Sequence, residues 1–137
     1  MATCDWAIVC DYAFLDITRK VCLIGVFDRI FTPAVPSVHP QAALALRLVG
    51  NPNETVDLRA EIIRPTGELL ARIEGRGELG DAGTAEVHMG MAGLPLPDFG
   101  IYAFNVYLGD ALAKTIAITV APPPPSSLAP EGGRGEG

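Results

Sequence analysis

The sequence lacks the features that mark several large classes of protein. No apolar run approaches the roughly 20 residues that a membrane-spanning helix needs, and no basic stretch followed by an apolar one stands at the start. We therefore expect neither membrane insertion nor secretion. The 10 Lys and Arg form no basic block and are outnumbered by 16 Asp and Glu, so nucleic acid is not an expected partner.

Motifs for catalysis and metal binding are also scarce. The cysteines Cys4, Cys10 and Cys22 match no zinc-binding spacing, and the two histidines lie far apart. In a hairpin that turns near residues 16–19, Cys10 and Cys22 do not face each other, so no disulfide is expected between them. An odd number of thiols without a secretion signal fits a reducing cytoplasm, where buried cysteine acts as a small apolar side chain. We expect no cofactor and no catalytic residue.

The residues that are present are typical of one folded domain. The chain has 137 residues, of which 49% are hydrophobic and 19% charged, which is enough for one core and too little for two ordinary domains. The composition changes after Ala121, where four successive prolines lead into a Gly-rich end. Such segments do not pack into a core, so we expect a folded domain in residues 1–121 and a disordered Pro/Gly-rich tail in residues 122–137.

Apolar and polar residues alternate with a period of two, as in half-buried β-strands. The pattern is plainest where Val56, Leu58, Ala60 and Ile62 alternate with charged residues. Turn residues separate eight such segments, which predicts strands at 6–14, 20–31, 42–50, 55–64, 68–76, 84–92, 100–108 and 113–120. The first two are apolar on both faces, which predicts a central position in their sheet. The fold class is therefore all-β, an antiparallel β-sandwich of about eight strands.

One motif narrows the fold further. The segment Asp98-Phe-Gly-Ile-Tyr102 has the spacing of a tyrosine corner, in which a Tyr near the start of strand F sends its hydroxyl back to upstream backbone. It resembles the corresponding corner of immunoglobulin-like domains. Phe104 then stands where antibody domains carry a disulfide-forming cysteine. The resemblance implies an immunoglobulin-like or related sandwich.

Three further segments carry a wider resemblance. They are Cys10-Asp-Tyr12, the stretch from Leu23 to Phe31, and Pro36-Ser-Val-His-Pro40. On these segments the body of the chain resembles a family of small bacterial proteins known only as a domain of unknown function. The resemblance implies a compact cytosolic β domain and supplies no catalytic residues.

A charged pair, Asp28-Arg29, interrupts an otherwise apolar stretch. Burial of such charges is costly unless each one is paired and hydrogen-bonded. This favours a strand bend in which Asp28 caps neighbouring backbone and Arg29 pairs with Asp5 or Asp11. The alternative is a recognition pair at the end of the strand.

Alternate connections of an antiparallel sandwich lie at the same end. One end is expected to collect acidic and amide residues, namely Asp16, Asn51, Asn53, Glu54, Glu78, Asp81 and Asp110. Carboxylate and carbonyl oxygens in such loops can bind Ca²⁺, but acidic loops are common at a net charge of -6 and no calcium-loop spacing occurs. The other end collects prolines and apolar residues. It is either a docking surface or a cover over the core.

We therefore expect a non-catalytic cytosolic protein-interaction module that docks an unknown protein through the Pro-rich end or an exposed strand edge. The candidate binding residues are Asp28, Arg29, Val35, Val38, His39, Leu96 and Phe99. Strand edges also allow a homo-oligomer. The alternatives are a sandwich that binds a small ligand or Ca²⁺, and an enzyme that uses Cys10 or Cys22, or Asp28 with His39.

Overall fold

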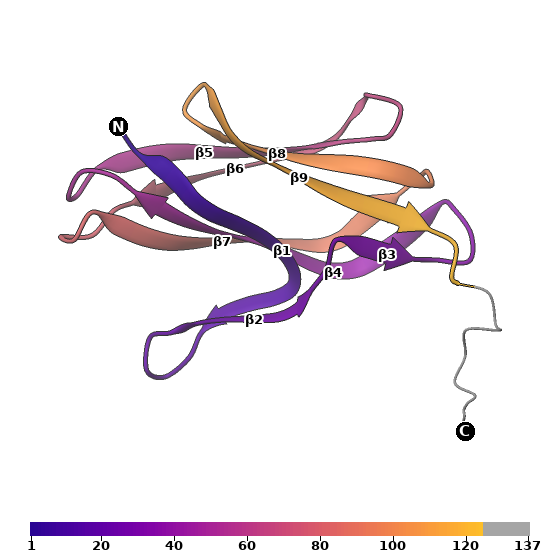
Figure 1. Ribbon diagram of the computed structural model, residues 1–137, viewed down its shortest axis with the longest axis horizontal. Helices are drawn as coiled ribbons and strands as arrows, with labels where there is room; N and C mark the ends of the chain where they lie inside the picture. Colours follow the sequence, from indigo (N-terminus) through magenta and orange to yellow (C-terminus); the bar gives the residue numbers. More distant parts are fainter. Residues whose placement is uncertain (125–137) are drawn as a thin grey trace.

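The computed structural model describes residues 1–124 and forms nine β-strands in that range. The strands are β1 (Thr3–Leu15), β2 (Val21–Val26), β3 (Arg29–Phe31), β4 (Ser37–Val49), β5 (Thr55–Ile63), β6 (Leu69–Glu78), β7 (Thr84–Leu96), β8 (Gly100–Leu108) and β9 (Ala111–Ala121). They form two facing sheets (Figure 1), with the orders β2-β1-β4-β7 and β3-β9-β8-β5-β6. Every neighbouring pair is antiparallel except β3 with β9. The predicted all-β sandwich is confirmed.

The strand order follows the immunoglobulin plan. The chain crosses between the sheets from β4 to β5 and again from β7 to β8, and β8 pairs with both β5 and β9. These strands correspond to B, C, E, F and G of an immunoglobulin domain, with β6 beside β5 in the position of the C′ strand of variable-type domains. The chain is therefore an immunoglobulin-like β-sandwich.

The core lies between the two sheets and is built from the alternation seen in the sequence. The four apolar side chains of β5 that carry the pattern are at most 6% exposed, and Leu44, Leu46 and Leu48 of the opposite sheet are fully buried. Burial of side chains of this size contributes about 1.5–3 kcal/mol each relative to exposure. The contacts between the sheets are therefore the main source of stability.

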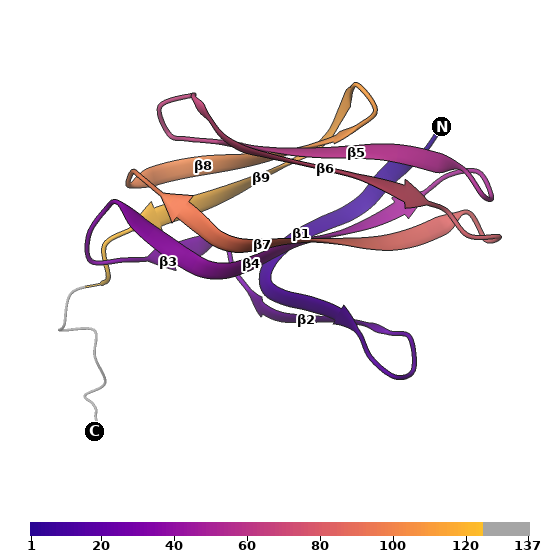
Figure 2. The ribbon, with the colours of Figure 1, turned by 180° about the vertical axis from the view of Figure 1, so that it is seen from behind.

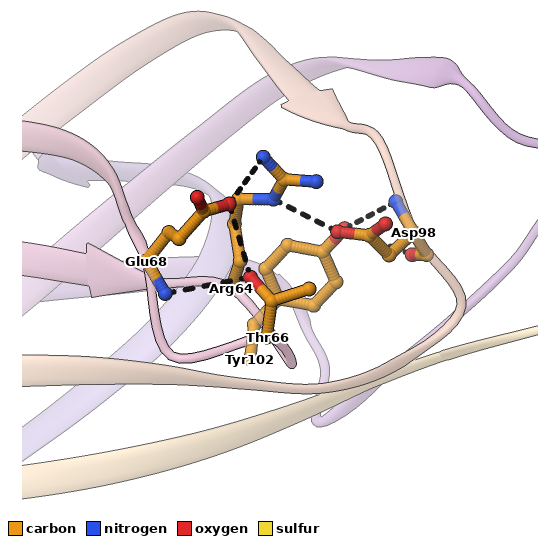
Figure 3. A network of polar contacts seen from close by, with 5 residues as sticks. All are labelled: Arg64, Thr66, Glu68, Asp98 and Tyr102. Atoms are coloured by element: carbon orange, nitrogen blue, oxygen red, sulfur yellow. Dashed lines mark hydrogen bonds and ion pairs between the residues drawn. The ribbon is translucent and has the colours of Figure 1, made fainter.

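The tyrosine corner is present at the start of β8 (Figure 3). The buried Tyr102 hydroxyl donates to the backbone oxygen of Asp98 at 2.8 Å and accepts from the backbone N–H of Asp98 at 2.9 Å. Burial raises the pKa of Tyr102, so its hydroxyl keeps the proton that it donates. Arg64 Nε donates to Asp98 Oδ2 at 2.9 Å, and Arg64 Nη1 donates to Glu68 Oε1 at 3.0 Å. These bonds tie the β5–β6 turn to the β7–β8 connection.

The strand expected at 20–31 is broken into β2 and β3, which is why there are nine strands rather than eight. After β2 ends, Phe27 N donates to Val9 O in one sheet, and Thr119 N donates to Asp28 O in the other. The backbone therefore changes sheets at these two residues. The central position expected for the first two strands is wrong for β2, which is an edge of its sheet.

Strands β4 and β7 extend further than the sequence indicates. The segments 37–40 and 93–96, which the sequence places outside the predicted strands, pair with each other in the register Ser37 with Leu96 and His39 with Leu94. Pro95 is compatible with this pairing because β7 is an edge strand, which needs no donor on its outer side. At the C-terminal side, β9 ends at Ala121. From residue 125 onward, the tail expected at residues 122–137 lies outside the described residues. Within residues 1–124, no helix is long and apolar enough to cross a membrane.

Candidate functional site

A two-stranded hairpin projects from the four-stranded sheet. Strand β1 pairs with β4 as far as Cys10, opposite Ala43, and beyond that point it pairs with β2 alone, up to Leu15 opposite Val21. Both views show β2 and the adjoining part of β1 leaving the body of the sandwich (Figures 1 and 2). We call residues 11–26 the projecting hairpin.

The turn of the projecting hairpin is held by one carboxylate. Asp16 Oδ1 accepts from Thr18 N at 2.8 Å, from Thr18 Oγ1 at 2.7 Å and from Lys20 N at 2.9 Å. These bonds, with the Thr18 hydroxyl first, lower the pKa of the Asp16 carboxyl. Arg19 adopts a positive φ of 71°, which closes the turn. The tip of the hairpin is thereby fixed in shape although it is surrounded by solvent.

Apolar side chains are unusually exposed on this hairpin. It carries six of the fourteen large apolar residues that are exposed in the described range, namely Tyr12, Phe14, Leu15, Ile17, Ile24 and Val26. Tyr12 lies directly opposite Ile24, at 55% and 53% exposure, so the even-numbered residues of both strands share one apolar face. Ile17 at the tip is 98% exposed. Exposed apolar side chains gathered on one element make the projecting hairpin a candidate docking surface.

A histidine and an aspartate join the base of the hairpin to β4. His39 Nε2 lies 2.9 Å from Asp11 Oδ1, and the His39 ring centroid lies 5.1 Å from that of Phe27. Gly25 has a positive φ of 71°, and a Cβ atom there would stand 2.5 Å from Asp11 Oδ2. Gly25 therefore provides the space that the carboxylate occupies. The three segments that carry the family resemblance contribute these four residues.

The structure places Asp28 and Arg29 where the chain changes sheets. Both residues are exposed, so neither charge requires a buried partner. The bend expected here exists, but its backbone bond is made by the Asp28 carbonyl oxygen. The partners expected for Arg29 are wrong, because Asp5 pairs with Arg47 at 3.4 Å and Asp11 pairs with His39.

The remaining candidate residues are split between surface and core. Val38 is 60% exposed and Phe99 is 40% exposed, while Val35 is half-buried. Leu96 is 2% exposed and joins Leu94 in the core, which fits the expected alternative of a cover over the core. His39 lies in a strand rather than in a loop. The Pro-rich end thus covers part of the core through Leu94 and Leu96 and exposes Val38 and Phe99.

The three cysteines are free, and the strand register explains why two of them do not meet. Cys10 lies opposite Val26 and Cys22 opposite Phe14, so the predicted separation of Cys10 from Cys22 is confirmed. Burial raises the pKa of the Cys10 thiol and also that of Cys4. A raised pKa reduces the fraction of the reactive thiolate at neutral pH.

In the acidic loops at the opposite end of the sandwich, a carboxylate accepts hydrogen bonds from backbone N–H groups. Glu54 accepts from Ala2 N at 3.1 Å and from Asn51 N at 3.0 Å, and Gly50 N donates to Gly83 O at 2.8 Å. Among residues 1–124, no group of three or more His, Cys, Asp or Glu side chains is placed to hold a metal ion. The Glu54 carboxylate therefore helps to close these loops.

A cavity of about 510 Å³ opens beside these loops, between the starts of β1 and β5 and the β8–β9 hairpin. Its lining includes the apolar side chains of Val56, Leu108 and Leu112, together with Cys4. Lys114 stands at the cavity as an exposed cation. The volume lies within the range of small-molecule sites, which is about 300–1,000 Å³.

Sequence reasoning missed the projecting hairpin as a site. Tyr12 and Ile24 lie in segments that are apolar on both faces, a pattern that predicts a central strand, and Ile17 lies in the turn between them. The sequence indicates Asp11 only as a partner of Arg29. The signal that points to this region is the family resemblance, whose segments meet at the base of the hairpin.

Comparisons with known proteins agree with that resemblance. No curated protein matches the chain. An immunoglobulin-like protein from Pseudomonas aeruginosa is 14% identical, with a TM-score of 0.42, over 88% of this chain and 96% of that protein. A glycosyl hydrolase family 2 member from Bacteroides cellulosilyticus is 14% identical, with a TM-score of 0.43; the match covers 69% of this chain and spans 15% of the hydrolase. The model of DUF6941, a family of unknown function, matches residues 5–121, and the chain therefore belongs to that family.

Proposed function

We propose that the chain is a non-catalytic cytosolic protein-interaction module that docks through the projecting hairpin. The observation that carries this proposal is the exposure of Tyr12, Ile24 and Ile17 on an element that the rest of the sandwich leaves uncovered. The turn at Asp16 and the contact between Asp11 and His39 hold the hairpin in place. Pre-ordered apolar surface binds at a lower cost in conformational entropy than a flexible segment does.

The non-catalytic part of the proposal is supported by what the titratable side chains do. Asp11 and His39 contact each other between two strands, and Asp98 is held by Arg64 beside the tyrosine corner. The raised pKa of Cys10 disfavours a nucleophilic thiolate. Each of these groups has a structural role that explains its position.

The experiment compares two matched pairs of surface substitutions. Tagged full chain, immobilised at equal density, is incubated with lysate of the native host, and bound proteins are quantified by mass spectrometry. Tyr12→Ser with Ile17→Ser alters the hairpin, and Val38→Ser with Phe99→Ser alters the Pro-rich end. All four side chains are at least 40% exposed, so both variants should melt at the wild-type temperature.

We expect the hairpin variant to lose the proteins that the wild type captures, copies of this chain included, and the Pro-rich variant to keep them. Capture that survives in the hairpin variant would refute docking through the hairpin. Loss in the Pro-rich variant alone would move the docking surface to Val38 and Phe99.

A second function, binding of a small ligand, is favoured by the cavity beside Lys114. Its lining is mostly apolar and includes Lys114 beside two carboxylates. Glu54 accepts from backbone N–H groups and Asp57 pairs with Arg76, which leaves the Lys114 cation to attract an apolar organic anion. The fluorescent probe 8-anilinonaphthalene-1-sulfonate has this chemistry, so we expect saturable binding that Lys114→Ala weakens. Arg72→Ala, which removes a cation paired with Glu61 away from the cavity lining, should leave the binding unchanged. Binding that disappears instead in the Tyr12→Ser, Ile17→Ser variant would assign the probe to the hairpin and reject the cavity.

A further inference from the structure

We infer that the cavity beside Lys114 binds a straight-chain alkyl carboxylate, with the carboxylate at Lys114 and the alkyl chain between the two sheets. This inference rests on the second proposed function, binding of a small ligand, and names the class of ligand. The cavity has a volume of about 510 Å³ and lies where β1 and β5 begin, beside the hairpin of β8 and β9. Both ribbon views show this hairpin curving away from the body of the sandwich (Figures 1 and 2).

The inner part of the cavity is an extension of the hydrophobic core. Val56 is 6% exposed and belongs to the core, and Cys4 and Leu108 pack against it. Cys4 lies opposite Leu48, which is fully buried, so both side chains point toward the space between the sheets. Ala111 lies opposite Leu108, and its small side chain leaves space on that side. An alkyl chain that enters here is removed from water by both sheets.

The lining favours an aliphatic ligand with a single polar end. None of the described residues that line the cavity is aromatic, so an aromatic ligand finds no ring to stack against. Two polar side chains of the lining already have partners in the chain. Cys4 Sγ donates to Trp6 O at 3.2 Å, and the two Glu54 oxygens accept from Ala2 N and Asn51 N. A ligand with many hydroxyl or amide groups would lose hydrogen bonds to water and find few to replace them.

Lys114 belongs to the row of β9 side chains that faces the core. Ile118 and Val120 of this row are each 1% exposed. Lys114 lies opposite Val106, which is equally buried, so it continues the row to the mouth of the cavity. Its ammonium group is near enough to Cys4 to oppose the rise in the thiol pKa that burial causes. The aliphatic stem of such a lysine lies along apolar surface while the charge stays in water.

The charges at the mouth favour one negative charge on the ligand. Asp57 pairs with Arg76 at 3.1 Å, and Glu54 accepts from backbone N–H groups, so Lys114 is the cation that attracts a carboxylate. A head group with two negative charges would also be repelled by these two carboxylates. A cationic head group would instead meet the Lys114 ammonium group. The mouth therefore selects a monoanion.

The test is isothermal titration of the full chain with decanoate, below the concentration at which decanoate forms micelles. We expect saturable binding whose affinity falls about tenfold from decanoate to octanoate, because two buried methylene groups are lost. Decyltrimethylammonium has the same chain and the opposite charge, so it should not bind. Lys114→Ala should weaken decanoate binding about fivefold, and Lys114→Arg should keep it.

Ala111→Phe provides a second variant, because it fills the cavity without a change of charge. Ala111 is exposed, so the larger side chain should be tolerated, as thermal melting will check. This variant should lose decanoate binding, whereas Tyr12→Ser with Ile17→Ser on the projecting hairpin should keep it.

Decanoate binding that survives Ala111→Phe, or that Lys114→Ala leaves unchanged, would overturn the inference. Equal binding of decyltrimethylammonium would overturn it as well. A chain that binds 8-anilinonaphthalene-1-sulfonate at Lys114 but does not bind decanoate would overturn the alkyl carboxylate alone and leave the proposed small-ligand function standing. A chain that binds neither compound would overturn both.

Discussion

Removal of one hydroxyl at the tyrosine corner tests how much its two hydrogen bonds to the Asp98 backbone contribute to the stability of the domain. In the variant Tyr102→Phe, the ring stays buried and only the two hydrogen bonds to the Asp98 backbone disappear. A protein hydrogen bond contributes about 1 kcal/mol net, and a partner left without its bond costs more when it is buried. We therefore expect a loss of about 2 kcal/mol in the free energy of unfolding.

The assay is thermal and urea unfolding of Tyr102→Phe beside a matched control on the same strand. Unfolding entropy of about 2.1 cal/mol/K per residue converts 2 kcal/mol into a fall of about 8 °C in Tm for a domain of this size. The control is Tyr107→Phe, whose ring lies 4.2 Å from the Arg59 guanidinium and keeps that contact. It should change the free energy of unfolding by less than about 0.5 kcal/mol. Equal effects of the two substitutions would refute the argument that the hydroxyl, rather than the ring, holds the corner.

Three other substitutions test local features. Gly25→Ala places a Cβ atom at a positive φ against the Asp11 carboxylate, so it should lower the free energy of unfolding in urea by about 2 kcal/mol. Asp11→Ala in the same chain should recover part of this loss. No effect of Gly25→Ala would contradict the crowding. Asp16→Ala should speed amide exchange at the hairpin turn. Because the folded pKa of Asp16 is lowered, its contribution is present above the ordinary carboxyl pKa of about 4 and is lost as pH falls through the folded value, so the gap between wild type and variant should close in acid. Leu96→Ala should lower the free energy of unfolding by about 3 kcal/mol and Val38→Ala by less than about 0.5 kcal/mol, and equal values in chemical denaturation would contradict their assignment to core and surface.

The sequence was sufficient for the fold class because its dominant signals are local. Alternation in β5 reports one buried face directly, and the spacing from Asp98 to Tyr102 requires only a turn and the start of a strand. The ends of the strands are harder to predict from the sequence. The prolines at 36, 40, 95 and 97 are turn residues by composition, yet two of the segments around them pair as strands because a partner strand is available.

The candidate site was less predictable because it depends on which strand has a neighbour. The segment Val21–Val26 is apolar on both faces whether it is covered by other strands or exposed at an edge, and sequence alone does not distinguish these cases. Leu96 shows the reverse, because its position between two prolines predicts a loop, whereas it pairs with Ser37 in a strand and its side chain is buried. Exposure at such positions is decided by long-range pairing, which local patterns do not report.

The contact between His39 and Asp11 holds the projecting hairpin against β4. We expect its loss to loosen the hairpin and to leave the core of the sandwich intact. His39→Ala removes one half-buried hydrogen bond, worth about 1 kcal/mol, and the ring contact with Phe27, while the core between β5 and β8 is untouched. Native-state amide exchange should therefore speed up about fivefold within residues 12–24 and stay constant in β5 and β8. His88→Ala, on the edge strand β7, is the matched control and should leave hairpin exchange unchanged. A uniform increase across the whole molecule would mean that the hairpin unfolds only with the sandwich, and the pair would then contribute to global stability instead of positioning a docking element.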